Sequence, residues 1–301
     1  MEEQEEMGAH GKASFIGQKI GEAFEGVVID FVKAYLEEAH SDYEILSPEE
    51  GRKLLTLEML GGLQRQLDTA VALKDSDDPV ALLEAKWLKD ARHWNDKGAW
   101  ILQLREIKKK HATIRGAVAV LAGYWKTGVG VWLQSEGGVK MIMVATDDEV
   151  YGTLQEPVNE HLKGSAFHLD AKEMRKRFPP QHINNFYRLM VSLEESGQLR
   201  RIAETWLDFD RQDENGAPVK GADLIKHAID ELLEPLPDTP KIQHFEISLQ
   251  LDTGNVIHEK FDDLEDLLEF ICEHSGDPAK ILERITPKKG PKQLALTQLK
   301  D

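Results

Sequence analysis

The chain has 301 residues, 41% of them hydrophobic and 30% charged, which is typical of a globular protein and excludes a disordered or collagen-like one. Its formal net charge of −17 argues against a protein that coats nucleic acid by bulk attraction. The single cysteine, Cys272, excludes an internal disulfide framework and a cysteine-cluster zinc site. No apolar run reaches about 18 residues and the acidic start lacks a secretory pattern, so we expect a cytoplasmic protein without a membrane span.

Two helices are predicted at the start of the chain. Apolar residues recur at steps of three and four over 15–38, which indicates one amphipathic helix. Over 47–62, Ser47 begins a capping box and a Gly-Gly pair suits a helix end. This second helix would place Glu58 among buried leucines, where a carboxylate lies at the rim or has a partner.

The middle of the chain predicts a hairpin, a helix and further strands. Residues 67–73 and 79–88 are rich in valine and leucine, and the turn-like sequence KDSDD between them predicts an antiparallel pair. A helical pattern follows over 95–111. Residues 113–125 suit a helix or a strand, and their alternating valines and flanking glycines favour a strand. Strands are also expected at 129–134 and 139–146. Thr146 then suits the cap of a helix over 146–162.

The pattern changes near residue 165. Segments over 171–235 are mostly helical, residues 241–261 predict a second hairpin, and a helix follows over 262–274. We therefore expect a mixed α/β (α+β) protein with a central mixed sheet flanked by helices. Its expected parts are an α/β core with the N-terminal helix, a helical region, and a small α+β appendage with a tail, at 1–164, 165–236 and 237–301.

The first hairpin carries the residues of greatest chemical interest. Its turn centres near Ser76, so residues whose numbers sum to about 152 face each other, and Asp68 is expected opposite Glu84. Two carboxylates about 5 Å apart repel unless a hard cation lies between them, and Mg²⁺, for which Mn²⁺ substitutes, prefers such ligands. Lys86 falls on the same strand face as Glu84, and Glu58 is a candidate further ligand. The competing interpretation is a cross-strand charge cluster on a solvated face.

The acid-x-Lys pattern alone has no specificity, because it occurs three times in the chain. Glu84 to Lys86 lies in an apolar strand, whereas Glu106 to Lys108 and Asp170 to Lys172 fall in predicted helices. Only the first has an opposed aspartate. The first occurrence is therefore the candidate site.

A helix before a strand carrying Asp68, then a turn, then LLEAKWL with its Glu-x-Lys, then a helix, resembles the PD-(D/E)XK nuclease superfamily, with the RQLDTAV lead-in similar to restriction and Mrr-type members. The resemblance covers roughly 45–165 and implies a restriction-endonuclease-like core. It implies that Asp68 and Glu84 bind Mg²⁺ and that Lys86 assists the attacking water. Leu67 stands where the family name has proline.

A basic stretch follows the hairpin. Between residues 101 and 126 there are six basic side chains and one acid. The residues expected to contact nucleic acid are Lys108, Lys109, Lys110, Arg115 and Trp94, the last of which lies in a polar segment. An ordinary solvated helix face is the alternative for the basic residues.

Together these features predict a Mg²⁺-dependent endonuclease of restriction type that hydrolyses DNA phosphodiester bonds. A symmetric homodimer is expected, because one site per chain then cuts each strand. The alternatives are a non-catalytic nucleic-acid-binding or regulatory protein on the same scaffold, and a nuclease for RNA or for branched or damaged DNA.

Overall fold

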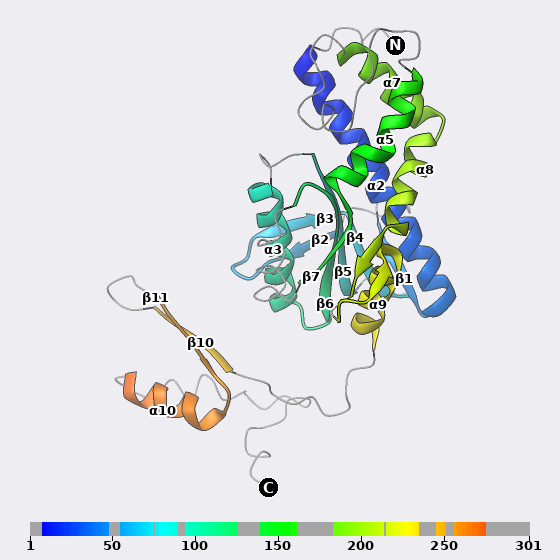
Figure 1. Cartoon of the computed structure of the whole chain (residues 1–301). Helices are drawn as coiled ribbons and strands as arrows, with labels where there is room; N and C mark the ends of the chain where they lie inside the picture. The colour runs from blue at the N-terminus through cyan, green and yellow to red at the C-terminus, as the bar shows by residue number, and fades with distance from the viewer. Residues whose placement is uncertain are drawn as a thin grey trace. The chain divides into compact units, whose positions relative to one another are not determined.

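The computed structural model describes residues 8–47, 55–74, 76, 78–89, 94–125, 139–161, 183–213, 215–234, 245–250 and 256–274. The chain divides into two compact units, Met1–Glu234 and Pro235–Asp301 (Figure 1). None of the described helices is both long and apolar enough to cross a membrane.

A five-stranded mixed sheet forms the centre of the first unit. In spatial order its strands are β1 (Tyr43–Leu46), β4 (Thr69–Leu73), β5 (Pro79–Leu88), β6 (Gly116–Gly123) and β7 (Val139–Thr146). The pairs β1 to β4 and β4 to β5 are antiparallel, whereas β5 to β6 and β6 to β7 are parallel. The predicted α/β class with a mixed sheet is therefore confirmed.

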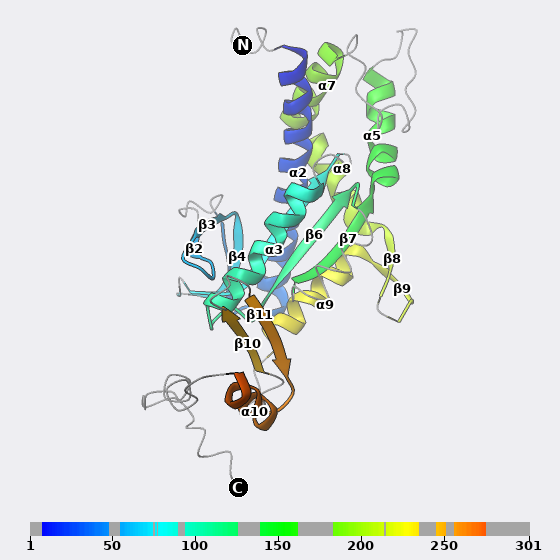
Figure 2. The same ribbon diagram turned by 90° about the vertical axis from the view of Figure 1, so that its left-hand side faces the viewer.

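Helices cover both faces of this sheet. Helix α3 (Trp94–Lys110) packs on one face, and α2 (Ala9–Ala39) and α9 (Gly221–Leu233) pack on the other (Figures 1 and 2). The predicted stripe of α2 is fully buried at Ile16, Ile20, Phe24 and Val28. Alternation along the strands supplies two separate apolar cores, one on each face of the sheet.

The helical segments after the sheet belong to the same unit. They are α5 (Asp147–His161), α7 (Ile183–Glu195), α8 (Gln198–Thr205) and the 3₁₀ helix η3 (Trp206–Asp208). Helices α7 and α8 pack against α2, and α9 packs against β7. A short antiparallel pair, β8 (Asp210–Gln212) with β9 (Pro218–Lys220), precedes α9. The described helices of the segment 165–236, expected as a helical region, share their buried core with the sheet.

The helix predicted over 47–62 is wrong where the structure describes it. Residues Leu55–Glu58 form strand β2, which pairs antiparallel with β3 (Gln64–Leu67). Gly61 and Gly62 have φ angles of 97° and 88°, so they form the left-handed turn between these strands. Apolar spacing over so short a segment suits either structure, and pairing with β3 decides for the strand. Residues 48–54, which carry most of the capping signal, lie outside the described residues.

The first predicted hairpin is confirmed, and so is most of its register. Thr69 pairs with Leu83 and Ala70 with Leu82, pairs whose numbers sum to the expected 152, before the register shifts by one after Val71. Asp68 precedes β4, so its expected pairing with Glu84 is not part of the ladder. The predicted helix over 95–111 and the strands at 113–125 and 139–146 are also confirmed, as α3, β6 and β7. The strand expected at 129–134 lies outside the described residues.

The second unit contains the other predicted hairpin and helix. Strand β10 (Phe245–Gln250) pairs antiparallel with β11 (Val256–Phe261), and α10 (Leu264–His274) follows. The ring centroids of Phe261 and Phe270 lie 5.2 Å apart, which ties α10 to the hairpin. The hairpin turn and the residues after 274 lie outside the described residues.

Candidate functional site

The first hairpin brings Asp68, Glu84 and Lys86 to one place. Asp68 lies directly between β3 and β4, and Glu84 and Lys86 lie on β5. Strand β4 begins opposite Leu83, so both β5 residues lie on the part of β5 that continues past this pairing. Because side chains alternate along a strand, Glu84 and Lys86 share the face on which Leu82 packs towards α3.

Lys86 is the centre of a cluster of carboxylates. Its Nζ lies 3.2 Å from Glu84 Oε1 and 3.3 Å from Asp68 Oδ2. Only 14% of the Lys86 side chain is exposed, compared with 49% for Asp68. The three residues that the sequence singled out therefore meet through one ammonium group.

A third carboxylate, which the sequence analysis missed, comes from α2. Glu25 Oε2 lies 3.7 Å from Lys86 Nζ. In the sequence, Glu25 is an acid directly after Phe24 in the buried stripe of α2, which is a weak signal on its own. Only the packing of α2 against β5 brings it to Lys86.

Arg65 of β3 is the second cation, and it too was missed. Its Nη2 lies 3.3 Å from Glu84 Oε1, and its Nη1 donates a hydrogen bond to the backbone carbonyl of Trp100 in α3. The Arg65 side chain is 10% exposed. One guanidinium therefore ties the hairpin β2–β3 to both β5 and α3. We refer to Lys86, Arg65, Asp68, Glu84 and Glu25 as the Lys86 cluster.

The Lys86 cluster has an excess of negative charge and an unsatisfied oxygen. Three carboxylates and two cations leave one net negative charge, with the Glu84 side chain only 2% exposed. Glu84 Oε2 is buried and has no hydrogen-bond partner, and it is the only carboxylate oxygen with this property among the described residues. An unpaired buried charge is costly, so this oxygen is suited to a further cation.

The carboxylate oxygens of the cluster are the type of ligand atom that a hard divalent cation prefers. Asp68 and Glu84 supply carboxylate oxygens, the ligands that Mg²⁺ prefers, and Glu84 Oε2 is uncommitted. In the described part of the chain, however, no three His, Cys, Asp or Glu side chains are arranged as a metal-binding group. Lys86 Nζ lies between the carboxylates, so they are spaced around an ammonium.

Electrostatics keep Lys86 charged. Burial lowers the pKa of Lys86. The three carboxylates of Glu84, Glu25 and Asp68 raise it by more than burial lowers it, so the pKa of Lys86 lies above its usual value. Burial lowers the pKa of Arg65 by more than the nearby Glu84 and Asp68 raise it, so the pKa lies below its usual value. The guanidinium nevertheless stays protonated, because the pKa of arginine is so high. The cluster therefore contains two permanent hydrogen-bond donors.

Glu58, expected as a further ligand on a helix, lies elsewhere. It ends strand β2, where its Oε1 is 3.3 Å from Lys110 Nζ and its carbonyl accepts a 2.9 Å hydrogen bond from His111 Nε2. Strand pairing and the end of α3 thus hold Glu58, and the structure does not bring it to Lys86.

The basic residues predicted to contact nucleic acid do not form one surface with the Lys86 cluster. Arg115 Nη1 donates to the carbonyls of Leu232 and Glu234 at 3.4 and 2.9 Å, so this guanidinium caps the end of α9. Lys110 pairs with Glu58, Lys109 is exposed and Lys108 is half-buried. The three lysines form the last turn of α3, where positive charge also favours the helix dipole. Trp94 begins α3, and its side chain lies outside the described residues.

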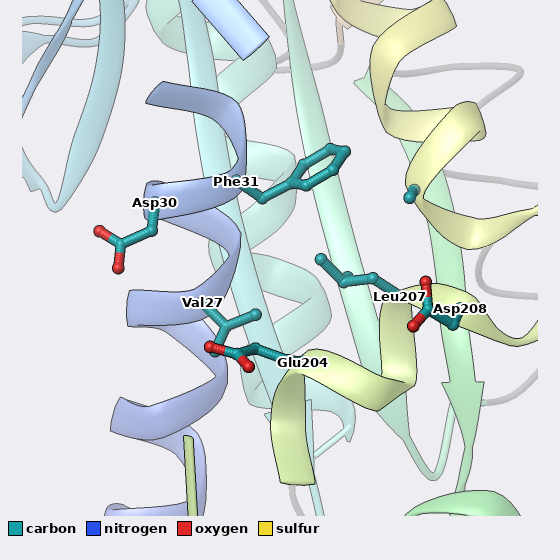
Figure 3. Close-up of a pocket in the computed structure, with 7 residues that line it drawn as sticks. Val27, Asp30, Phe31, Glu204, Leu207 and Asp208 are labelled. Carbon is teal, nitrogen blue, oxygen red and sulfur yellow. The ribbon is translucent and has the colours of Figure 1, made fainter. Parts of the chain in front are cut away.

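A pocket of about 350 Å³ lies apart from these residues. It opens between α2, the end of α8 with η3, and the start of α9 (Figure 3). Its lining is Val27, Asp30, Phe31, Glu204, Leu207, Asp208 and Ala222. Asp30 also pairs with Arg200. None of the predicted site residues lines this pocket, so the Lys86 cluster remains the candidate site.

Comparisons of the chain with protein-family models, curated proteins and solved structures find no match.

Proposed function

We propose that this protein is a Mg²⁺-dependent nuclease that hydrolyses phosphodiester bonds of DNA at the Lys86 cluster. The observation that carries the proposal is the buried, unpartnered Glu84 Oε2 beside Asp68 in a cluster with net negative charge. The expected resemblance to PD-(D/E)XK nucleases, and with it a restriction-endonuclease-like core and a cytoplasmic location, is part of this proposal. The β4–β5 hairpin followed by α3 supports it.

Each residue of the cluster has a separate role in this proposal. Asp68 and Glu84 hold the cation, which when bound supplies Lewis acidity to the phosphoryl group. Lys86 donates hydrogen bonds to the phosphoryl oxygens and stabilises the negative charge that develops during attack by water. Arg65 orients Glu84 through its contact with Oε1, and Glu25 positions Lys86.

Cleavage of plasmid DNA with Mg²⁺ or Mn²⁺ tests this function. Wild type is expected to nick or linearise the plasmid, and Asp68→Ala and Lys86→Ala are expected to lose at least about 100-fold of this rate. Lys140→Ala is the matched control, because Lys140 forms a surface pair with Glu231. If wild type leaves unmodified DNA from varied sources intact, the proposed activity is wrong.

A non-catalytic protein is the second candidate, because Lys86 already pairs with all three carboxylates. A self-contained ion cluster would need no cation. Calorimetry separates the two: a nuclease site binds Mn²⁺ and loses that binding in Asp68→Ala, whereas a structural cluster shows no binding in either protein.

A homodimer is the assembly that we propose for cutting both strands. Light scattering measures it directly, with the protein free and bound to DNA. A monomer in both states would exclude this assembly.

A further inference from the structure

Trp100 in α3 is tied to the Lys86 cluster through its backbone, and its side chain is unusually exposed. Large apolar side chains of α3 such as Ile101, Leu104 and Ile107 are buried, but Trp100 is 49% exposed. Its backbone carbonyl accepts a hydrogen bond from Arg65, whose other nitrogen contacts Glu84. The backbone of Trp100 is therefore one guanidinium away from the proposed hydrolytic site.

The position of Trp100 along α3 agrees with this contact. Helix α3 returns along the sheet after β5, and six residues of helix from Trp94 advance about 9 Å. About three strand residues span the same distance, which returns the chain from the end of β5 at Leu88 to the level of Glu84 and Lys86. The hydrogen bond from Arg65 to the Trp100 carbonyl agrees with this estimate, so the backbone of Trp100 lies level with the cluster.

An ammonium group lies over the indole, and exposed apolar side chains lie further along α3. Lys97 Nζ lies 4.4 Å from the centroid of the Trp100 ring, one helical turn earlier. Leu60 and Leu63, in the turn between β2 and β3, are 55% and 69% exposed. Leu60 N donates to the carbonyl of Glu106, which places this turn against α3 about 9 Å along the helix from Trp100. An aromatic face with an ammonium beside it matches a nucleobase joined to a phosphate.

We propose that Trp100 is a stacking platform for an unpaired nucleobase, so that the strand cut at the Lys86 cluster is unpaired next to the cleaved bond, whether it is a single strand, part of a branch, or a locally opened stretch of a plasmid duplex. In a duplex the base faces are already stacked on each other, and an indole on a protein surface reaches only an unpaired base. Lys97 provides the charge for the adjoining backbone. This inference rests on the proposed function for its substrate role, but the binding that it describes is measured separately.

Fluorescence anisotropy with the full chain in EDTA measures binding without cleavage. The probes are labelled oligothymidylate, labelled oligouridylate, and a blunt DNA duplex of equal length. Wild type is expected to bind a single strand at least about tenfold more tightly than the duplex. The two single strands distinguish DNA from RNA as the source of the base.

Variants identify the contact. Trp100→Ala is expected to weaken single-strand binding about tenfold and duplex binding little, and Trp100→Phe to restore most of it, because the ring rather than the indole nitrogen is used. Leu73→Ala is the matched control, because Leu73 is 44% exposed at the far end of β4, about 17 Å along the strand from Asp68. Thermal unfolding of each variant checks that the fold is intact.

The outcomes separate this inference from the proposed function. Equal affinity for duplex and single strand, or unchanged binding by Trp100→Ala, overturns the stacking platform. So does loss of self-association in Trp100→Ala with unchanged nucleic-acid binding, which would make the patch a protein interface. Trp100-dependent binding without any cleavage supports the platform and rejects the nuclease, whereas cleavage of a single strand at the wild-type rate by Trp100→Ala supports the nuclease and rejects the platform.

Discussion

Two charged clusters in the first unit use similar residues in opposite ways. Glu149 in α5 and Glu84 in β5 each contact an arginine whose side chain is largely buried. Both oxygens of Glu149 have partners: Oε1 accepts from Arg211 Nη1 at 3.1 Å, and Oε2 accepts from Thr146 N at 2.7 Å and from Arg211 Nη2 at 2.5 Å. Glu84 has partners only at Oε1. We refer to Arg211, Glu149 and Thr146 as the Arg211 cluster.

The difference shows how a structural cluster is distinguished from a candidate site. In the Arg211 cluster one carboxylate meets one guanidinium, and Arg211 also donates to the carbonyl of Val144. The charges balance and the hydrogen bonds close, so nothing further is needed. In the Lys86 cluster the charges do not balance and one buried oxygen is left over. Residue types alone do not reveal this difference.

The largest effect is expected from Lys86→Met, which removes the ammonium but keeps most of the side-chain volume. Three carboxylates would then face Arg65 alone, so the free energy of unfolding is expected to fall by about 3–5 kcal/mol. Mn²⁺ is expected to restore part of that loss, because it binds the folded carboxylates. Denaturant unfolding with and without Mn²⁺ measures both; no restoration would argue that the cluster does not accept a cation.

Arg211→Met is expected to have a somewhat smaller effect. Glu149 would keep its hydrogen bonds from Thr146, so the free energy of unfolding should fall by about 2–3 kcal/mol. Mn²⁺ should not restore it, because the Arg211 cluster has one carboxylate. The same unfolding measurement applies, and restoration by Mn²⁺ would remove the contrast between the two clusters.

The pH dependence of the Arg211 cluster is a third test. Burial raises the pKa of Glu149. Hydrogen bonds from Arg211 and Thr146 lower it by more than burial raises it, so the pKa in the folded protein lies below the usual value. The stabilisation is therefore complete above the unfolded pKa of about 4.5 and is lost as pH falls through the folded pKa. Glu149→Gln should be less stable than wild type by about 1 kcal/mol at pH 7, allowing for solvent screening, with a smaller gap below pH 4. A gap that widens on acidification would contradict this assignment.

The smallest effect is expected from Glu58→Gln. Its pair with Lys110 is about 40% exposed on both sides, so the free energy of unfolding should change by less than about 0.5 kcal/mol. DNA cleavage should be unchanged, since Glu58 contacts Lys110 rather than Lys86. Loss of Mn²⁺ binding in this variant would restore the role that the sequence suggested for Glu58.

Several features were predictable because they depend on residues close together in the chain. The capping pattern at Thr146 is confirmed: Thr146 N donates to Glu149 Oε2, and Glu149 N donates to Thr146 Oγ1 at 3.4 Å. The helix predicted over 47–62 is wrong from Leu55 onwards, where strand β2 begins. Pairing of β2 with β3, which is not local to the capping signal, decides the structure there.

The sequence by itself determined the antiparallel pairing of β4 with β5, and with it that Asp68 and Glu84 lie near the same end of this pair, because strand alternation leaves one pairing that buries the apolar face. Only the tertiary structure decided that Glu25 and Arg65 join them, that Glu58 and Arg115 bind elsewhere, and that Glu84 keeps an unpaired oxygen. Those contacts join α2, β2–β3, α3 and α9 to distant parts of the chain. Their presence depends on how whole elements pack, which local spacing does not specify.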